Sequence, residues 1–193
     1  MYFRDRTTAS SSSTAFSLVE LLITMAIIGI LTTLVIVKYS SFNSAVLLKS
    51  QVYELALNLR EAQVFSISVR GESNQFRNPY GVYFSTGSPN TYILFRDDDG
   101  ASAVIYDTSP ADEQVGDAFT IDTRFRILRI CVNDCSQDVN NVSVSFRRPD
   151  FDAHMAVAGV GVVTSAEIIV ATVADTSITR SVRINSTGQI QIE

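Results

Sequence analysis

Residues 15–37, AFSLVELLITMAIIGILTTLVIV, form an apolar run in which Glu20 is the single ionisable residue. As a helix rising 1.5 Å per residue, the run spans about 33 Å, which is enough to cross the hydrocarbon core of a bilayer. A carboxylate at that depth costs about 2.5–3.5 kcal/mol on insertion scales. The sequence therefore predicts a membrane-spanning helix and a partner for Glu20.

The residues around the start of this run resemble the class III signal of type IV pilins and type II secretion pseudopilins. A short leader with basic residues and a small residue, Ala15, precede FSLVELL at residues 16–22. The resemblance implies that a prepilin peptidase cuts between Ala15 and Phe16 and methylates the new amine. It also implies that Glu20 of one subunit pairs with the Phe16 amine of the next. Gly29 matches the glycine at which a pilin helix can loosen.

Two positions depart from the family pattern. Ala15 stands where the family usually has Gly, so we expect cleavage to proceed but more slowly. Val37 stands where a proline often follows the glycine by a few turns. The alternative is an ordinary signal anchor that carries a Glu. A conventional secretory peptide would have a shorter apolar core and a small-residue cleavage site after it, and residues 43–45 (NSA) are a poor candidate for such a site.

The leader sets the expected orientation in the membrane. Arg4 and Arg6 lie in it against one acidic residue, Asp5. Positively charged ends stay cytoplasmic, so everything after Lys38 is expected outside. The predicted location is the bacterial cytoplasmic (inner) membrane, crossed once with the head outside, and then a periplasmic or extracellular filament.

From Lys38 the chain remains helical in pattern but becomes amphipathic up to Arg70. Apolar residues recur at steps of three and four, at Ala45, Leu48, Val52, Leu55, Leu59, Ala62 and Val69. Most polar residues lie off this stripe, among them Lys49, Glu54, Asn58, Arg60, Glu61 and Gln63. Gly71 is a plausible helix stop. The pattern predicts one helix from Phe16 to Arg70 with a core-facing stripe.

After Gly71 the apolar period changes to two, which indicates strands. Residues 80–85 and 91–96, joined by TGSPN, form a hairpin pattern. Further strands are predicted at 103–106, 124–132, 142–146, 166–173, 177–184 and 189–192, with a tight turn at 185–188. The stretch between Pro149 and Thr164 favours a loop or a weak edge hairpin. The fold class is α+β, pilin-like, with the helix covering one face of antiparallel sheet. Its expected parts are a leader (1–15), a membrane and filament-core helix (16–37), an amphipathic helix half (38–71) and a β-rich head (72–193).

Two further segments are similar to the GspH/FimT-like minor pseudopilins, namely LREA at residues 59–62 and RINSTGQI at residues 183–190. In some relatives, Arg residues in the final segment contact DNA during uptake. Residues 188–193 contain no Arg, which leaves Arg180 and Arg183 as candidates. The alternative for both is a solvated sheet face. A net charge of −5 also argues against a nucleic-acid partner.

Cys131 and Cys135 are the only cysteines. Outside the cytoplasm such a pair predicts a disulfide, which would stabilise a small turn by roughly 2 kcal/mol. Free thiols are the alternative. A redox site usually has two residues between its cysteines, and a metal site needs more ligands. The acidic run at residues 97–100 lacks the alternating oxygens of a calcium loop, so a solvated hairpin turn is expected there.

Catalytic motifs are absent from the sequence. His154 is the only histidine, so a metal site with several histidine ligands is excluded. No nucleophile elbow, phosphate loop or H-E-x-x-H motif occurs. We therefore expect no enzyme activity and no cofactor.

The resulting hypothesis is a structural subunit of a type IV pilus-like or type II secretion filament, which assembles through its N-terminal helix. Its implied partners are the membrane, prepilin peptidase and other pilin or pseudopilin subunits, and the resemblance adds an assembly platform protein and an ATPase. The alternative is a minor or tip pilin whose head binds DNA, a secreted substrate or a surface.

Overall fold

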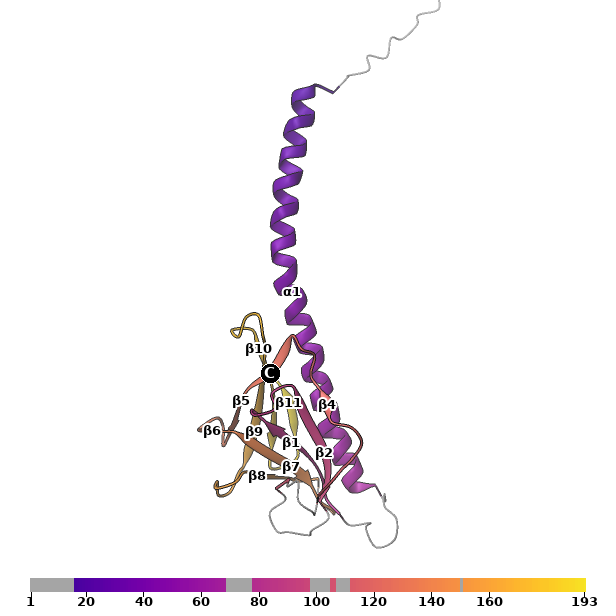
Figure 1. The fold of residues 1–193 in the computed structure, drawn as a ribbon, viewed down its shortest axis with the longest axis vertical. Helices are drawn as coiled ribbons and strands as arrows, with labels where there is room; N and C mark the ends of the chain where they lie inside the picture. Colours follow the sequence, from indigo (N-terminus) through magenta and orange to yellow (C-terminus); the bar gives the residue numbers. More distant parts are fainter. Residues whose placement is uncertain (1–15, 69–77, 98–104, 107–111, 150) are drawn as a thin grey trace, which may run out of the picture. The chain divides into compact units, whose positions relative to one another are not determined.

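The computed structural model describes residues 16–68, 78–97, 105–106, 112–149 and 151–193, with the backbone alone at 37–42. The chain divides into two compact units, Met1–Phe42 and Asn43–Glu193. One helix, α1 (Leu18–Ile67), has residues in both units, and all strands belong to the second (Figure 1). The α+β class, with an N-terminal apolar helix and a β-rich head, is confirmed.

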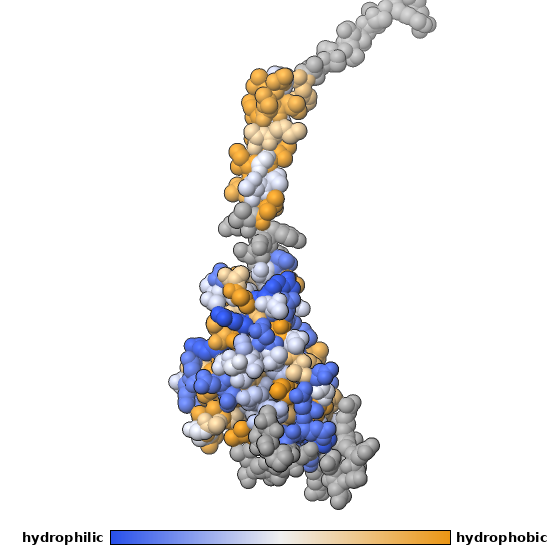
Figure 2. Space-filling view, viewed as in Figure 1, coloured by the Kyte–Doolittle hydropathy of each residue, from blue (hydrophilic) through white to orange (hydrophobic). Residues whose placement is uncertain are grey.

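The first unit consists of the apolar part of α1. Leu18–Ile36 is long and apolar enough, by length and composition, to cross a membrane. None of its side chains is buried within the chain. Apolar atoms cover most of this segment in the space-filling view (Figure 2). Such a helix, which is hydrophobic all round, requires lipid or other protein around it.

In the second unit, α1 is amphipathic as predicted. The buried residues of the stripe are Leu48, Val52, Leu55, Leu59 and Ala62. Asn58 and Gln63 are also buried, although the spacing placed them away from the core. The helix ends at Ile67, three residues before the predicted end. Val69 and Gly71 lie outside the described residues.

The strands form two antiparallel sheets rather than the single sheet surface expected from the sequence. The first sheet has the order β3-β2-β1-β7-β8, and β4 also pairs with β2. Its strands are β1 (Tyr80–Ser85), β2 (Thr91–Asp97), β3 (Asp112–Gln114), β4 (Phe119–Thr120), β7 (Asn141–Phe146) and β8 (Ala153–Ala156). The second sheet has the order β11-β10-β9-β5-β6. Its strands are β5 (Phe125–Val132), β6 (Gln137–Val139), β9 (Ser165–Thr172), β10 (Thr179–Asn185) and β11 (Ile190–Ile192).

Both sheets contribute to one hydrophobic core with α1. Four phenylalanines are fully buried, Phe84, Phe95, Phe125 and Phe146, and they come from β2, β5 and the central pair β1 and β7. Close packing leaves no room for a side chain at Gly81, because a Cβ there would lie 2.7 Å from the Val144 carbonyl oxygen. The helix therefore closes a core that two sheets share.

Most predicted strands occur within two residues of their predicted bounds. The 103–106 strand is not supported, because Ile105 and Tyr106 are not in a strand and the other two residues lie outside the described part. The stretch after Pro149 contains β8, which pairs with β7 at the edge of the first sheet. The acidic run begins with Asp97, which is the buried last residue of β2, and its remaining residues are not described.

A buried hydrogen bond ties α1 to the first sheet. The Asn58 amide donates to the Tyr92 hydroxyl oxygen at 2.6 Å. Tyr92 is 4% exposed, and burial raises the pKa of its phenol to about 12, with a smaller opposing effect of the Asn58 hydrogen bond. The phenol of the unfolded chain ionises near pH 10, so the folded state retains a proton that the unfolded state loses.

This difference predicts alkaline destabilisation. The contribution of Tyr92 is fully present below pH 10 and is lost as the pH rises toward about 12. Two pKa units correspond to about 3 kcal/mol. We expect Tyr92→Phe, in urea unfolding followed from pH 8 to 12, to lose this part of the pH dependence. Tyr53→Phe is the control, because Tyr53 is exposed and this variant should keep the wild-type profile. Parallel profiles for wild type and Tyr92→Phe would contradict the assignment.

Candidate functional site

The first turn of α1 places the two residues of the predicted pairing one turn apart. Phe16 precedes the helix and is 77% exposed. The Leu21 amide donates to the Ser17 carbonyl oxygen at 3.1 Å, so the helical hydrogen bonds begin one residue after Phe16. Glu20 follows Phe16 by four residues and lies in the first turn. Ala15 lies outside the described residues.

The hydroxyl groups of the apolar segment are satisfied within the helix. Thr24 donates to the Leu21 carbonyl oxygen at 2.9 Å, Thr32 to that of Ile28 at 2.7 Å, and Thr33 to that of Gly29 at 2.8 Å. Such bonds remove the cost of taking a hydroxyl into an apolar medium. These three threonines therefore need no partner outside the helix.

Glu20 differs from the threonines in this respect. Among the residues that the structure describes, its carboxylate has no hydrogen-bond or ion-pair partner. Gly29 lies inside the continuous helix, and a Cβ at this position would meet no atom within 4 Å. Packing within the chain therefore does not explain a glycine at position 29.

Residues 10–36 match the family model described as the prokaryotic N-terminal methylation motif. The N-terminal part of the chain therefore carries a prepilin-type methylation motif. The matched range ends at Ile36, the last residue of the apolar segment. Comparisons with curated proteins and with solved structures gave no match. The motif implies processing by prepilin peptidase and assembly with other pilin subunits, and together with the apolar helix it is consistent with anchoring in the inner membrane.

The β-rich head contains a tightly held turn at the end of β5. Cys131 and Cys135 form a disulfide across it. Asn133, Asp134 and Cys135 all have left-handed backbone angles, with φ of 53°, 57° and 56°. Non-glycine residues rarely adopt this conformation, and Asn and Asp tolerate it best. The sequence between the two cysteines, VND, thus suits the turn.

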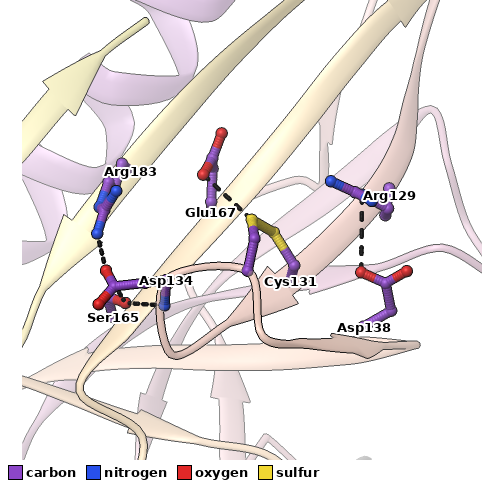
Figure 3. The surroundings of a disulfide bond; sticks show 8 residues. Arg129, Cys131, Asp134, Asp138, Ser165, Glu167 and Arg183 are labelled. Atoms are coloured by element: carbon purple, nitrogen blue, oxygen red, sulfur yellow. Dashed lines mark hydrogen bonds and ion pairs between the residues drawn. A yellow bond between two sulfur atoms is a disulfide. The ribbon is translucent and has the colours of Figure 1, made fainter.

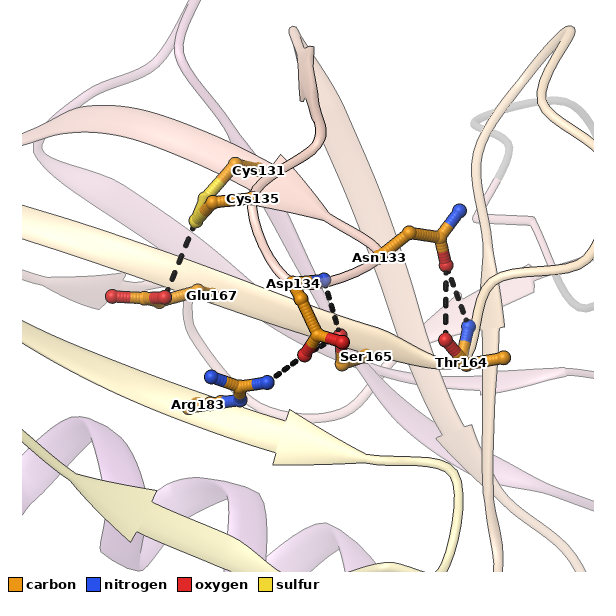
Figure 4. A network of polar contacts seen from close by, with 8 residues as sticks. All are labelled: Cys131, Asn133, Asp134, Cys135, Thr164, Ser165, Glu167 and Arg183. Carbon is orange, nitrogen blue, oxygen red and sulfur yellow. Dashed lines mark hydrogen bonds and ion pairs between the residues drawn. A yellow bond between two sulfur atoms is a disulfide. The ribbon is translucent and has the colours of Figure 1, made fainter.

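Hydrogen bonds to the start of β9 hold the same turn (Figure 4). The Asn133 side-chain oxygen accepts from the backbone amide of Thr164 at 2.9 Å and from its hydroxyl at 3.2 Å. The Asp134 amide donates to the Ser165 hydroxyl oxygen at 2.8 Å. These bonds do not involve the sulfur atoms, so the turn has two independent restraints.

The two candidate DNA-contacting arginines lie on β10 in different settings. Arg183 is half-buried and forms an ion pair with Asp134 of the disulfide turn (Figure 3). Arg180 is exposed, and its guanidinium donates to the Thr179 carbonyl oxygen at 3.0 Å. The structure therefore does not bring them together as a free basic pair.

Sequence reasoning missed one neighbour of the cysteines. Glu167 on β9 places its Oε2 3.2 Å from the Cys135 sulfur. The residues are 32 apart in the chain, and only the pairing of Cys131 with Glu167 across β5 and β9 brings them together. The sequence did place Cys131 and Glu167 in predicted strands, but it did not predict the register that pairs these strands.

Proposed function

We propose that this chain is a pilin-like protein and a structural subunit of a type IV pilus-like or type II secretion filament. Prepilin peptidase would cut between Ala15 and Phe16, and a platform protein and ATPase would then move the subunit from the membrane into a helical filament. The observation that carries the proposal is the apolar segment, whose threonine hydroxyls are bonded within the helix and whose one carboxylate is not.

The role proposed for Glu20 is to select the axial position of each subunit. In the filament core, apolar contacts between helices replace contacts with lipid and depend little on register. A charged pair between Glu20 and the Phe16 amine of a neighbour forms at one stagger only. At other staggers the carboxylate stays buried without a partner, which costs about 3–5 kcal/mol for a broken buried pair. The pair thus determines register more than it adds net stability.

The first test of the proposal concerns processing, since the Phe16 amine exists only after cleavage. We expect mass spectrometry of the filament-associated protein to find an N-terminal peptide that begins at Phe16 and carries a methyl group. An intact Met1, or a start after Val37, would contradict both the processing step and the pairing.

Variants at position 15 test the expected effect of the alanine. Prepilin peptidase must accommodate the side chain before the cut, and alanine adds one methyl group to glycine. We expect Ala15→Gly to be processed faster than wild type in a pulse-chase experiment and Ala15→Leu to remain as the precursor. Efficient cleavage of Ala15→Leu would show that the peptidase does not select the residue at position 15 by its size.

A further inference from the structure

We propose that the reduced form of the disulfide turn binds a thiophilic divalent cation, with zinc as the best match. The ligands are the thiolates of Cys131 and Cys135 and the carboxylate of Glu167. This inference concerns the head alone and goes beyond the proposed role of the N-terminal helix.

The three side chains already have the spacing of a metal site. Their candidate ligand atoms all lie within 4.8 Å of one another. Glu167 Oε2 is 3.2 Å from the Cys135 sulfur, and the Cα atoms of the two cysteines are 4.7 Å apart. A tetrahedral zinc ion with bonds of about 2.3 Å to sulfur and about 2.0–2.2 Å to oxygen needs ligand atoms roughly 3.5–3.8 Å apart. Once the sulfur–sulfur bond is absent, side-chain rotation alone can reach that spacing.

The sheet register fixes the position of the carboxylate. Glu167 is paired with Cys131 on β5 and with Arg183 on β10 (Figure 3). Arg183 instead forms its ion pair with Asp134. Within the described part of the chain, the only polar partner found for the Glu167 carboxylate is the Cys135 sulfur. A carboxylate that faces sulfur rather than its neighbouring arginine is oriented to act as a third ligand.

Burial gives the site one fixed and two accessible ligands. Cys131 is fully buried at the end of β5, so the sheet sets the position of its sulfur. Cys135 and Glu167 are half-buried. An ion and a water molecule can therefore reach the site from one side, and that water would be the fourth ligand of a tetrahedral ion.

The turn is expected to persist after reduction. Asn133 is bonded to Thr164, and Asp134 is bonded to Ser165 and Arg183, without participation of the sulfur atoms (Figure 4). These contacts hold Cys135 close to Cys131 when the covalent link is open. The fold thus holds the ligands close together before the ion binds, which lowers the entropic cost of binding.

A dithiol can reduce the Cys131–Cys135 disulfide and so form the proposed site. The donor dithiol passes two electrons and two protons to the Cys131–Cys135 disulfide, which becomes two thiols, and the donor becomes a disulfide. Binding of the cation then releases both thiol protons, because the metal ligands are thiolates. Two thiolates favour zinc and other soft cations over calcium or magnesium, which prefer oxygen ligands.

The test uses the full chain in detergent micelles with cobalt(II) as the spectroscopic probe and zinc(II) as the competitor. A phosphine reduces the disulfide and becomes the phosphine oxide with one oxygen from water. We expect one cobalt per chain, with thiolate-to-cobalt charge-transfer absorption, only after reduction. Zinc should displace the cobalt, and reoxidation should release the ion. Equal binding before and after reduction, or no charge-transfer band, would overturn the proposal.

Two variants test whether Glu167 binds the ion directly or whether any nearby carboxylate has the same effect. Glu167→Gln should weaken zinc binding by the reduced chain at least tenfold, because the amide is a neutral and poorer ligand. Asp138→Asn is the matched control, since Asp138 lies opposite Cys131 on β6 but pairs with Arg129 at 3.6 Å. Its affinity should equal that of wild type. If Glu167→Gln binds as tightly as wild type, with unchanged circular dichroism, Glu167 is not a ligand and the proposed site is wrong.

Discussion

Replacing Glu20 by alanine is expected to leave the chain inserted in the membrane and cleaved, but to lower its share in sheared filaments at least tenfold. In the proposed role, the single carboxylate of the apolar segment selects the register of the subunits only while its charge is present. A loss of about 1.4 kcal/mol at each subunit addition already corresponds to a factor of ten. The measurement is the ratio of filament to membrane protein on immunoblots, combined with mass spectrometry of the N-terminus.

Two variants make the Glu20 experiment specific. Glu20→Gln keeps the size and hydrogen-bonding capacity but removes the charge, and we expect it to assemble as poorly as Glu20→Ala. Thr32→Val is the control, because the Thr32 hydroxyl is bonded to the Ile28 carbonyl oxygen and needs no outside partner. It should assemble like wild type. Normal incorporation of Glu20→Ala would rule out the pairing role.

Gly188→Ala is expected to lower the free energy of unfolding of the head by about 2–5 kcal/mol. Gly188 closes the turn between β10 and β11 with φ of 74°, and its amide donates to the Asn185 carbonyl oxygen at 2.9 Å. A left-handed backbone costs a non-glycine residue about 1–2 kcal/mol. A Cβ here would also overlap the Phe151 carbonyl oxygen and lie 3.0 Å from the Gln63 amide nitrogen. Such overpacking typically costs a further 1–3 kcal/mol.

Gly159→Ala separates the two contributions in the Gly188 prediction. Gly159 has nearly the same backbone angle, φ of 76°, but a Cβ there would meet no atom within 4 Å. Gly159→Ala should therefore lower the free energy of unfolding only by the conformational cost, about 1–2 kcal/mol. Urea unfolding of the full chain in detergent measures both. Equal losses for the two variants would show that the contact with Phe151 is absent in solution.

The elements that the sequence predicted well are those with strong local patterns. The hairpin of β1 and β2 is rich in aromatic and β-branched residues around a turn that contains Gly87 and Pro89, so local chemistry determines it. The buried stripe of α1 follows its spacing in the same way. The apolar segment that begins at Leu18 has the clearest pattern of all. A helix that is apolar on every side needs lipid or other protein around it, so its composition alone predicts a membrane or filament environment.

The elements that the sequence missed depend on pairing with distant segments. For the stretch that contains β8, Ala153–Ala156, the sequence left a loop and a weak edge hairpin open, and the pairing with β7 makes it an edge strand. β3, Asp112–Gln114, is polar and is defined by its pairing with β2. The division into two sheets could not be predicted either, since strands of both sheets have the same alternation of apolar residues.

The candidate sites show the same division between local and distant information. Phe16, Glu20 and Gly29 lie in one continuous motif and were predicted together. Glu167 was not connected with the cysteines, because its position beside Cys135 results from the register of β5 and β9. Buried Asn58 was missed because its partner, Tyr92, is a tyrosine 34 residues away in the chain.

The fastening of the end of α1 has a mechanical consequence. Arg148 donates to the carbonyl oxygens of Ser66 and Ser68, and Gln63 donates to the Phe151 carbonyl oxygen at 3.1 Å. Arg148 thus holds two carbonyl groups at the end of the helix, of the kind that an isolated helix leaves free, and Gln63 attaches the last turns to the head. Both partners in the head lie in the connection between β7 and β8. Under traction along the helix, these bonds share the load with the buried face of α1 and oppose detachment of its C-terminal end. A tensile load on the helix is therefore opposed by the buried face and by these bonds together.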